Sequence, residues 1–140
     1  MNIPKGKIIE GNITKHMDRR FLSSLDLIGA GEVTLTIDRV ELVERLEYLN
    51  GNTETNAKLL YFTETEKPLT LCVTNIKALI RICGNTKAKE WHGKRVVVVA
   101  KKVKAFGRLV DAVRIIGADE GGKIVYDEDP AERLNKRLKK

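Results

Sequence analysis

The chain has 140 residues, 42% of them hydrophobic, which suffices for one domain with its own core. Its longest apolar run, residues 96–100, is too short to span a membrane, and residues 1–20 contain no apolar stretch typical of a secretory signal. We therefore expect a cytoplasmic protein without a membrane partner. Two cysteines exclude a disulfide-rich scaffold, and the net charge of +7 is distributed unevenly along the chain, which suggests one basic face.

The N-terminal third predicts a flexible arm, a short helical turn and one long strand. Residues 1–20 are polar and have no sustained period, so we expect an arm. The apolar residues between Phe21 and Ile28 predict a turn of helix. Over Val33–Leu46, apolar and polar residues alternate with the period of a strand. The alternation changes phase near Arg39, which predicts a bulge that bends the strand so that its halves serve two sheets.

The middle of the chain predicts two further strands and one helix. Asn-Gly and small polar residues over 49–56 indicate a loop, and a second strand follows over Lys58–Thr63. A third strand is predicted over Leu69–Val73. Apolar side chains then recur at helical spacing over Asn75–Cys83, and Gly84 is placed to end this helix.

Residues 93–116 predict a strongly basic β-hairpin. Four consecutive valines indicate a strand buried on both faces. Gly107 can adopt the positive φ of a turn, and residues 108–116 return as the next strand. The hairpin contains seven Lys or Arg residues and one acid, a local net charge of +6, which is typical of a surface that meets an anion. Lysines also keep edge strands from aggregating, and this alternative stays open.

The predicted order of elements is strand, strand, strand, helix, strand, strand. A long bent first strand and a helix between the third and fourth strands are typical of a five-stranded Greek-key barrel of the OB type. We therefore expect an all-β fold with one short helix. The predicted organisation is a flexible N-terminal arm over 1–20, an OB-like barrel domain over 21–117, and a polar and basic C-terminal tail over 118–140.

Four segments resemble a family of small phage and prophage proteins of OB-like fold. The resemblance covers residues 21–116 and is carried by EVTLTIDRVE, KPLTLCVTNIKALIRICG, WHGKRVVV and KVKAFGRLVDAVRI. The most specific pieces are Trp-x-Gly-Lys-Arg and Phe-Gly-x-x-Val-Asp-Ala-x-Arg. The resemblance implies single-stranded DNA binding in a bacterial host cell.

On an OB barrel, an oligonucleotide lies across strands two and three, between the loop joining the first two strands and the loop joining the last two. Cations contact the phosphates and aromatic side chains stack on the bases. The predicted nucleic-acid-binding residues are Lys58 and Tyr61 on the second strand, Lys101, Lys102, Lys104, Phe106 and Arg108 near the tip of the basic hairpin, and Arg114 on the last strand.

Several aromatic residues also admit a packing role. Phe106 is as well suited to fold back onto the barrel rim as to stack on a base. Tyr61 and Phe62 are adjacent and point to opposite faces of a strand, so we expect Phe62 in the core. We expect Trp91 to pack at the junction between the helix and the fourth strand rather than to stack on a base.

No activated nucleophile, catalytic pair of acids, metal-ligand cluster or Gly-rich nucleotide motif stands out, so we expect no enzyme, metal or cofactor. The predicted function is binding of single-stranded DNA, with RNA left open, with little sequence preference and in phage or prophage replication or recombination. The alternative is a protein-interaction or assembly module of a phage complex that binds no nucleic acid. Phage or host replication proteins are candidate partners, and the oligomeric state stays open.

Overall fold

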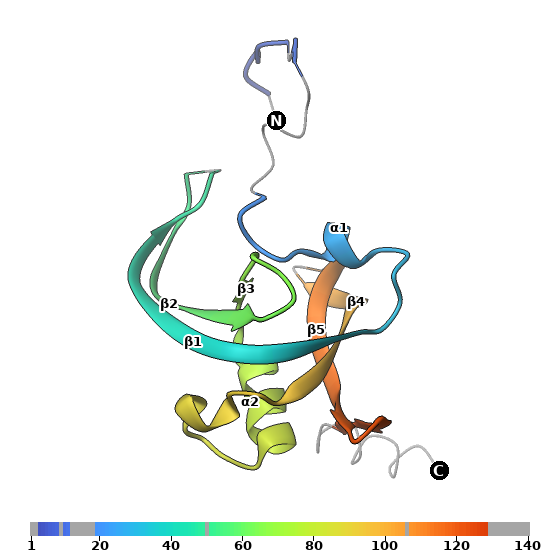
Figure 1. Ribbon diagram of the computed structural model, residues 1–140. Coiled ribbons are helices and arrows are strands. Elements are labelled where there is room, and N and C mark those ends of the chain that lie inside the picture. The colour runs from blue at the N-terminus through green and yellow to red at the C-terminus, as the bar shows by residue number, and fades with distance from the viewer. Residues whose placement is uncertain (1–2, 9, 12–18, 50, 106, 129–140) are drawn as a thin grey trace.

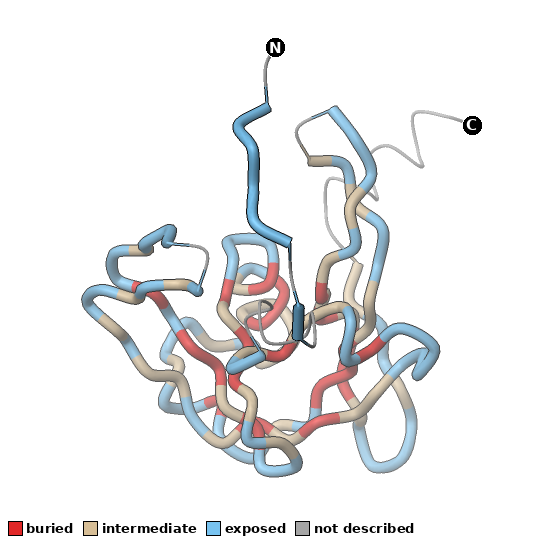
Figure 2. The backbone as a smooth tube through the Cα atoms, turned by 90° about the horizontal axis from the view of Figure 1, so that it is seen from above, coloured by how far each residue is buried: buried red, intermediate tan, exposed pale blue. Residues whose placement is uncertain are grey.

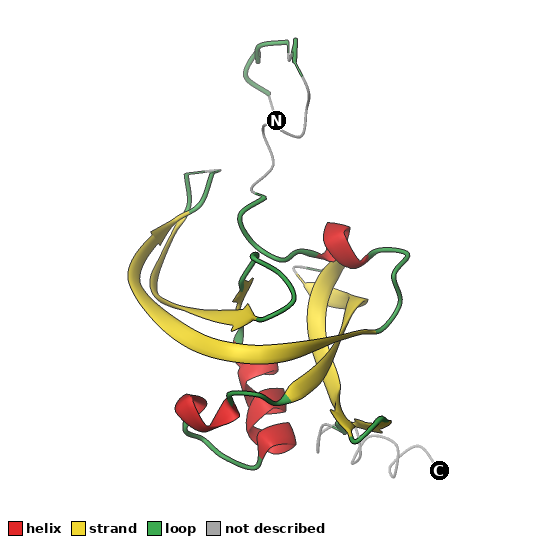
Figure 3. Cartoon of the chain, in the orientation of Figure 1, coloured by secondary structure: helices red, strands yellow, loops and turns green. Residues whose placement is uncertain are grey.

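The computed structural model describes residues 3–8, 10–11, 19–49, 51–105 and 107–128. The described chain is mostly β, with one antiparallel sheet of six strands and little helix (Figures 1 and 3). In chain order the elements are α1 (Ser24–Leu27), β1 (Val33–Glu47), β2 (Thr53–Phe62), β3 (Leu69–Thr70), α2 (Val73–Cys83), η2 (Ala88–Trp91), β4 (Arg95–Ala105), β5 (Arg108–Glu120) and β6 (Lys123–Tyr126). Across the sheet the strands lie in the order β3-β2-β1-β4-β5-β6.

β1 is a long, bent strand that joins the two halves of the sheet. Residues 33–36 pair with β4, and the part from Ile37 onward pairs with β2. The register to β2 shifts between Ile37 and Arg39, so the bulge predicted from the change of phase is confirmed. Figure 1 shows β1 curving across the whole sheet as a result.

The turn between β1 and β2 is shorter than the loop predicted over residues 49–56. The Tyr48 N–H donates to the Asn52 carbonyl at 2.8 Å, and the Gly51 N–H donates to the Tyr48 carbonyl at 3.0 Å. β2 therefore begins at Thr53. Threonine favours the extended backbone, so residues that read as a polar loop continue the ladder instead.

β3 is shorter than predicted, because α2 begins early. β3 holds two residues, and α2 starts at Val73 with Cys72 as its N-cap, which ends the strand predicted to run to that point. Gly84 ends α2 with φ of 65°, as predicted. In the described part of the chain, no helix is long and apolar enough to cross a membrane.

The sheet has six strands rather than five, because β6 pairs with the end of β5. The two strands are joined by a turn at Gly121 and Gly122, which both have positive φ. The predicted boundary between barrel and tail at residue 117 thus falls inside β5. The sequence does contain a signal for β6, which is a Gly-Gly pair followed by a short apolar segment. Sequence reasoning missed it because the surrounding composition is typical of a polar tail.

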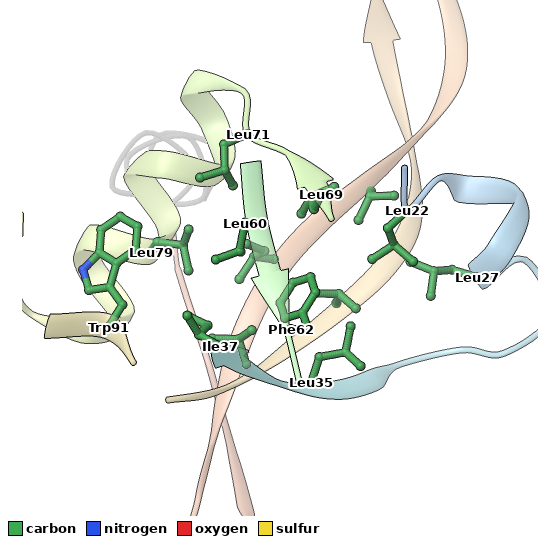
Figure 4. Packing of buried hydrophobic residues seen from close by; sticks show 14 residues of the cluster. Leu22, Leu27, Leu35, Ile37, Leu60, Phe62, Leu69, Leu71, Leu79 and Trp91 are labelled. Carbon is green, nitrogen blue, oxygen red and sulfur yellow. The ribbon is translucent and has the colours of Figure 1, made fainter. Parts of the chain in front are cut away.

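The core lies between the curved sheet, α1 and α2, and Figure 4 shows its side chains converging from these elements. Phe62 is 4% exposed while Tyr61 is half-buried, so the choice of Phe62 for the core is confirmed. Trp91 is 3% exposed, and its Nε1–H donates to the Asn85 carbonyl at 2.8 Å, so its predicted packing role is confirmed too. In Figure 2 the buried positions gather near the centre, and the outer ends of the hairpins are exposed or intermediate.

The sheet is not closed: among the described residues, no ladder joins β3 to β5. At this open edge of β5, the side chain of Asn75 on α2 takes the place of a neighbouring strand. Its Nδ2 donates to the Val113 carbonyl at 3.0 Å, and its Oδ1 accepts the Ile115 N–H at 3.1 Å. The edge is thus covered by one helix side chain.

Candidate nucleic-acid interface

β4 and β5 form the predicted basic hairpin, and its two faces carry different side chains. In an antiparallel ladder, paired residues point to the same face, and neighbours along a strand point to opposite faces. The register pairs Lys101 with Ala112. Every second pair along the hairpin lies on the same face, and these pairs include Arg114 opposite Val99 and Arg108 opposite Ala105. We call this side of the hairpin the Lys101 face, which comprises Val99, Lys101, Val103, Ala105, Arg108, Val110, Ala112 and Arg114.

The opposite side, which we call the Lys102 face, continues the row of core residues from β4 and β5. It comprises Val98, Ala100, Lys102, Lys104, Leu109, Asp111, Val113 and Ile115. Lys102 and Asp111 are direct cross-strand partners, and the Lys102 Nζ lies 3.4 Å from the Asp111 Oδ1. This face therefore partly neutralises its own positive charge.

The Lys101 face carries three cations and, among the described residues, no acid. Lys101 and Arg108 are exposed, and Arg114 is half-buried. The Arg114 Nη1 donates to the Val113 carbonyl at 3.2 Å and contacts the Cys72 Sγ at 3.6 Å, neither of which is a carboxylate. The structure thus separates the predicted hairpin cations into an uncompensated group and a partly compensated one.

Tyr61 on β2 is already engaged by a cation. Arg39 lies opposite Tyr61 in the ladder, and its guanidinium carbon is 4.0 Å from the centre of the tyrosine ring. Arg39 also forms ion pairs with Asp38 and Glu41, both at 2.5 Å. Arg39 therefore covers one face of the Tyr61 ring. The carboxylates of Asp38 and Glu41, which pair with Arg39, make these surroundings less favourable for phosphates.

Lys58 lies on the opposite face of β2 from Tyr61. It pairs with Leu42, whereas Tyr61 pairs with Arg39, and the two positions differ by an odd number of residues. The structure therefore does not bring these two predicted residues together on one surface of β2.

Phe106, the predicted stacking residue at the tip, lies outside the described residues. Its neighbour Gly107 has φ of 76°, so the predicted turn at this glycine is confirmed. The role of the Phe106 ring stays a prediction.

Sequence reasoning missed the contact between Arg39 and Tyr61. The available signal was an arginine at the change of phase, but the pairing also needs the register across β1 and β2.

Both cysteines are free. Among the described residues, no group of three or more His, Cys, Asp or Glu side chains could hold a metal ion.

Comparisons with protein-family models, with curated proteins and with solved structures found no match to this chain. The chemistry of the hairpin is therefore the basis for a functional proposal.

Proposed function

We propose that this protein binds single-stranded DNA, with little sequence preference, through the Lys101 face. The supporting observation is that Lys101, Arg108 and Arg114 share one face of the hairpin with no described carboxylate among them. Every nucleotide of a single strand offers the same phosphate, so cations that follow the backbone bind without reading the bases. RNA offers the same phosphates and is tested beside DNA.

We also propose that the fold is a variant of the OB-type barrel. In this variant the barrel stays open between β3 and β5, and β6 is an additional strand. This fold is supported by β1, which pairs with both β2 and β4 and bends at a bulge, and by α2, which lies between β3 and β4 in the chain. Nucleic acids often bind such barrels beside the hairpin of the last two barrel strands. The fold supports nucleic-acid binding only by analogy, whereas the positive charge of the hairpin supports it independently.

The resemblance of residues 21–116 to phage and prophage proteins supports a biological setting. In this setting the protein acts in phage or prophage replication or recombination, inside a bacterial host cell. It contributes binding and no catalytic step. In this setting, the expected protein partners are phage or host replication proteins.

Fluorescence anisotropy with labelled oligo(dT) at two salt concentrations tests the proposal. Three phosphate contacts predict that the logarithm of the association constant falls with the logarithm of salt concentration with a slope of about −2. Oligo(dA) and oligo(rU) of the same length measure base and sugar preference, and affinities within about threefold of each other indicate backbone binding. Absence of binding to every oligonucleotide at low salt would remove the proposal.

A protein-interaction module is the second candidate, because exposed leucines lie on the hairpins. Leu109 is 63% exposed and pairs with Lys104 on the Lys102 face, and Leu42 on β1 is also 63% exposed. Protein interfaces combine an apolar centre with a polar rim, and the pair of Leu109 with Lys104 fits this pattern. Capture of replication proteins that survives nuclease treatment and is lost in Leu109→Ser would favour this role, provided that oligo(dT) binding is absent.

A further inference from the structure

A pocket of about 250 Å³ lies beside the Lys101 face, where α2 approaches β4 and β5. Residues from separate segments of the chain line it. Those that carry a charge or a hydroxyl are Thr74 and Arg81 of α2, Lys101 of β4, Arg114 of β5, and Asp127. The remaining lining is largely aliphatic and offers few groups that could recognise the edge of a base.

The acid of this pocket is already paired. Arg81 Nε and Nη2 donate to the Asp127 carboxylate in three contacts of 2.8–3.2 Å, and the Asp127 side chain is only 11% exposed. Such a bidentate pair fixes both groups in one geometry. Asp127 is the one carboxylate among the described lining residues, so Lys101 and Arg114 leave two positive charges in excess.

Lys101 and Arg114 lie at neighbouring positions on the Lys101 face. Arg114 pairs with Val99, which precedes Lys101 by two residues, so the cations are diagonal neighbours on one face, with Cα atoms about 7–8 Å apart. Arg114 is oriented toward the start of α2 by its contact with the Cys72 Sγ. Two cations that line the same pocket repel each other, and an anion bound between them would relieve the repulsion.

We propose that this pocket binds the terminal phosphate of a nucleic-acid strand, an inference that rests on the proposed function. A phosphodiester within a strand carries one negative charge, whereas a terminal phosphate monoester carries close to two at neutral pH. The two excess charges of Lys101 and Arg114 match the monoester. The Thr74 hydroxyl supplies a neutral donor from α2. The protein would thus favour strands that end in a phosphate.

Three versions of labelled oligo(dT) test the inference: one with a 5′-phosphate, one with a 3′-phosphate, and one with hydroxyls at both ends. We expect one phosphorylated version to bind about tenfold more tightly than the unphosphorylated one at fixed salt. Arg114→Gln and Thr74→Val should each bring this ratio toward one. Lys77→Gln, at an exposed position of α2 outside the pocket lining, should leave the ratio unchanged.

The outcomes separate this inference from the proposed function. Equal affinity for all three versions would overturn the terminal-phosphate site and leave single-strand binding intact. If no version binds, the proposed function fails, and inorganic phosphate titrated against the amide signals of Thr74 and Arg114 decides on the pocket. Shifts of these signals would keep a phosphate site, and their absence would overturn it.

Discussion

The side-chain amide of Asn75 donates a hydrogen bond to the backbone carbonyl of Val113 across the open edge of β5, at 3.0 Å. The same amide accepts the Ile115 N–H at 3.1 Å, and Asn75 is 2% exposed. Two buried backbone groups of an unpaired strand edge are satisfied by one helix side chain, which ties α2 to the basic hairpin.

Removing this amide should destabilise the fold. Asn75→Ala leaves a buried carbonyl and a buried N–H without partners, so we expect a loss of about 2–3 kcal/mol in the free energy of unfolding. Asn75→Asp should be similarly harmful, because a carboxylate cannot donate to Val113. Urea unfolding measures both, with Lys77→Ala at an exposed position of α2 as the control. Parent-like stability of Asn75→Ala would show that the amide does not hold this edge.

At Gly117, β6 lies too close to β5 to leave room for a side chain. A Cβ placed there would lie 2.6 Å from the Val125 carbonyl oxygen, a backbone atom that cannot move alone. We expect Gly117→Ala to cost about 1–3 kcal/mol and to release β6, which faster amide hydrogen exchange at Val125 would reveal. Gly6→Ala, where an added Cβ meets no atom within 4 Å, is the matched control. Unchanged exchange at Val125 would contradict the close approach.

Trp91 is the single tryptophan, so its fluorescence reports on one buried site. Trp91→Phe loses the bond from Nε1 to the Asn85 carbonyl and part of the core volume, and we expect it to lower stability by about 2 kcal/mol. Saturating oligo(dT) should leave the Trp91 emission of the parent nearly unchanged. Strong quenching would instead mean that the ring contacts bases.

Glu64 should contribute to the loss of stability in acid. Partial burial raises its pKa, but hydrogen bonds from the backbone N–H and hydroxyl of Thr36, both at 2.7 Å, and from the Thr63 hydroxyl outweigh burial, so the pKa lies below its usual value. A carboxyl with a lowered folded-state pKa stabilises the fold above its unfolded-state pKa, and this stability is lost as pH falls through the folded-state value.

The pH dependence of Glu64→Gln follows from that sign. The variant should be less stable than the parent near neutral pH, and the difference should shrink as the pH falls from about 5 through the lowered pKa of the folded state. Urea unfolding at several pH values measures it. A difference that stays constant over this range would show that ionisation of Glu64 is not linked to folding.

Local patterns in the sequence predicted the elements whose cause is local. The change of phase at Arg39 gives the bulge, the apolar stripe over Asn75–Cys83 gives most of α2, and Gly107 gives the hairpin turn. Each depends on the spacing of side chains within one segment, which the sequence displays directly.

The features that sequence reasoning missed depend on contacts between distant segments. Asn75 looks like a polar residue beside the apolar stripe, and its partners on β5 lie 38 and 40 residues away. The separation of Lys101 from Lys102 into different faces was implicit in strand alternation, but the partner Asp111 follows only from the register of the hairpin. The contact of Arg39 with Tyr61 likewise needs the register of β1 and β2.

The most direct test of the Lys101 face compares two double variants that remove the same charge from opposite sides of one hairpin. Lys101→Ala with Arg108→Ala should weaken oligo(dT) binding and reduce the salt slope by about 1.4 units, because two phosphate contacts are lost. Lys102→Ala with Lys104→Ala should change affinity and slope much less. Fluorescence anisotropy across a salt series measures both, and circular dichroism checks that both variants are folded. Equal losses from the two faces, or a larger loss from the Lys102 face, would contradict the proposed interface.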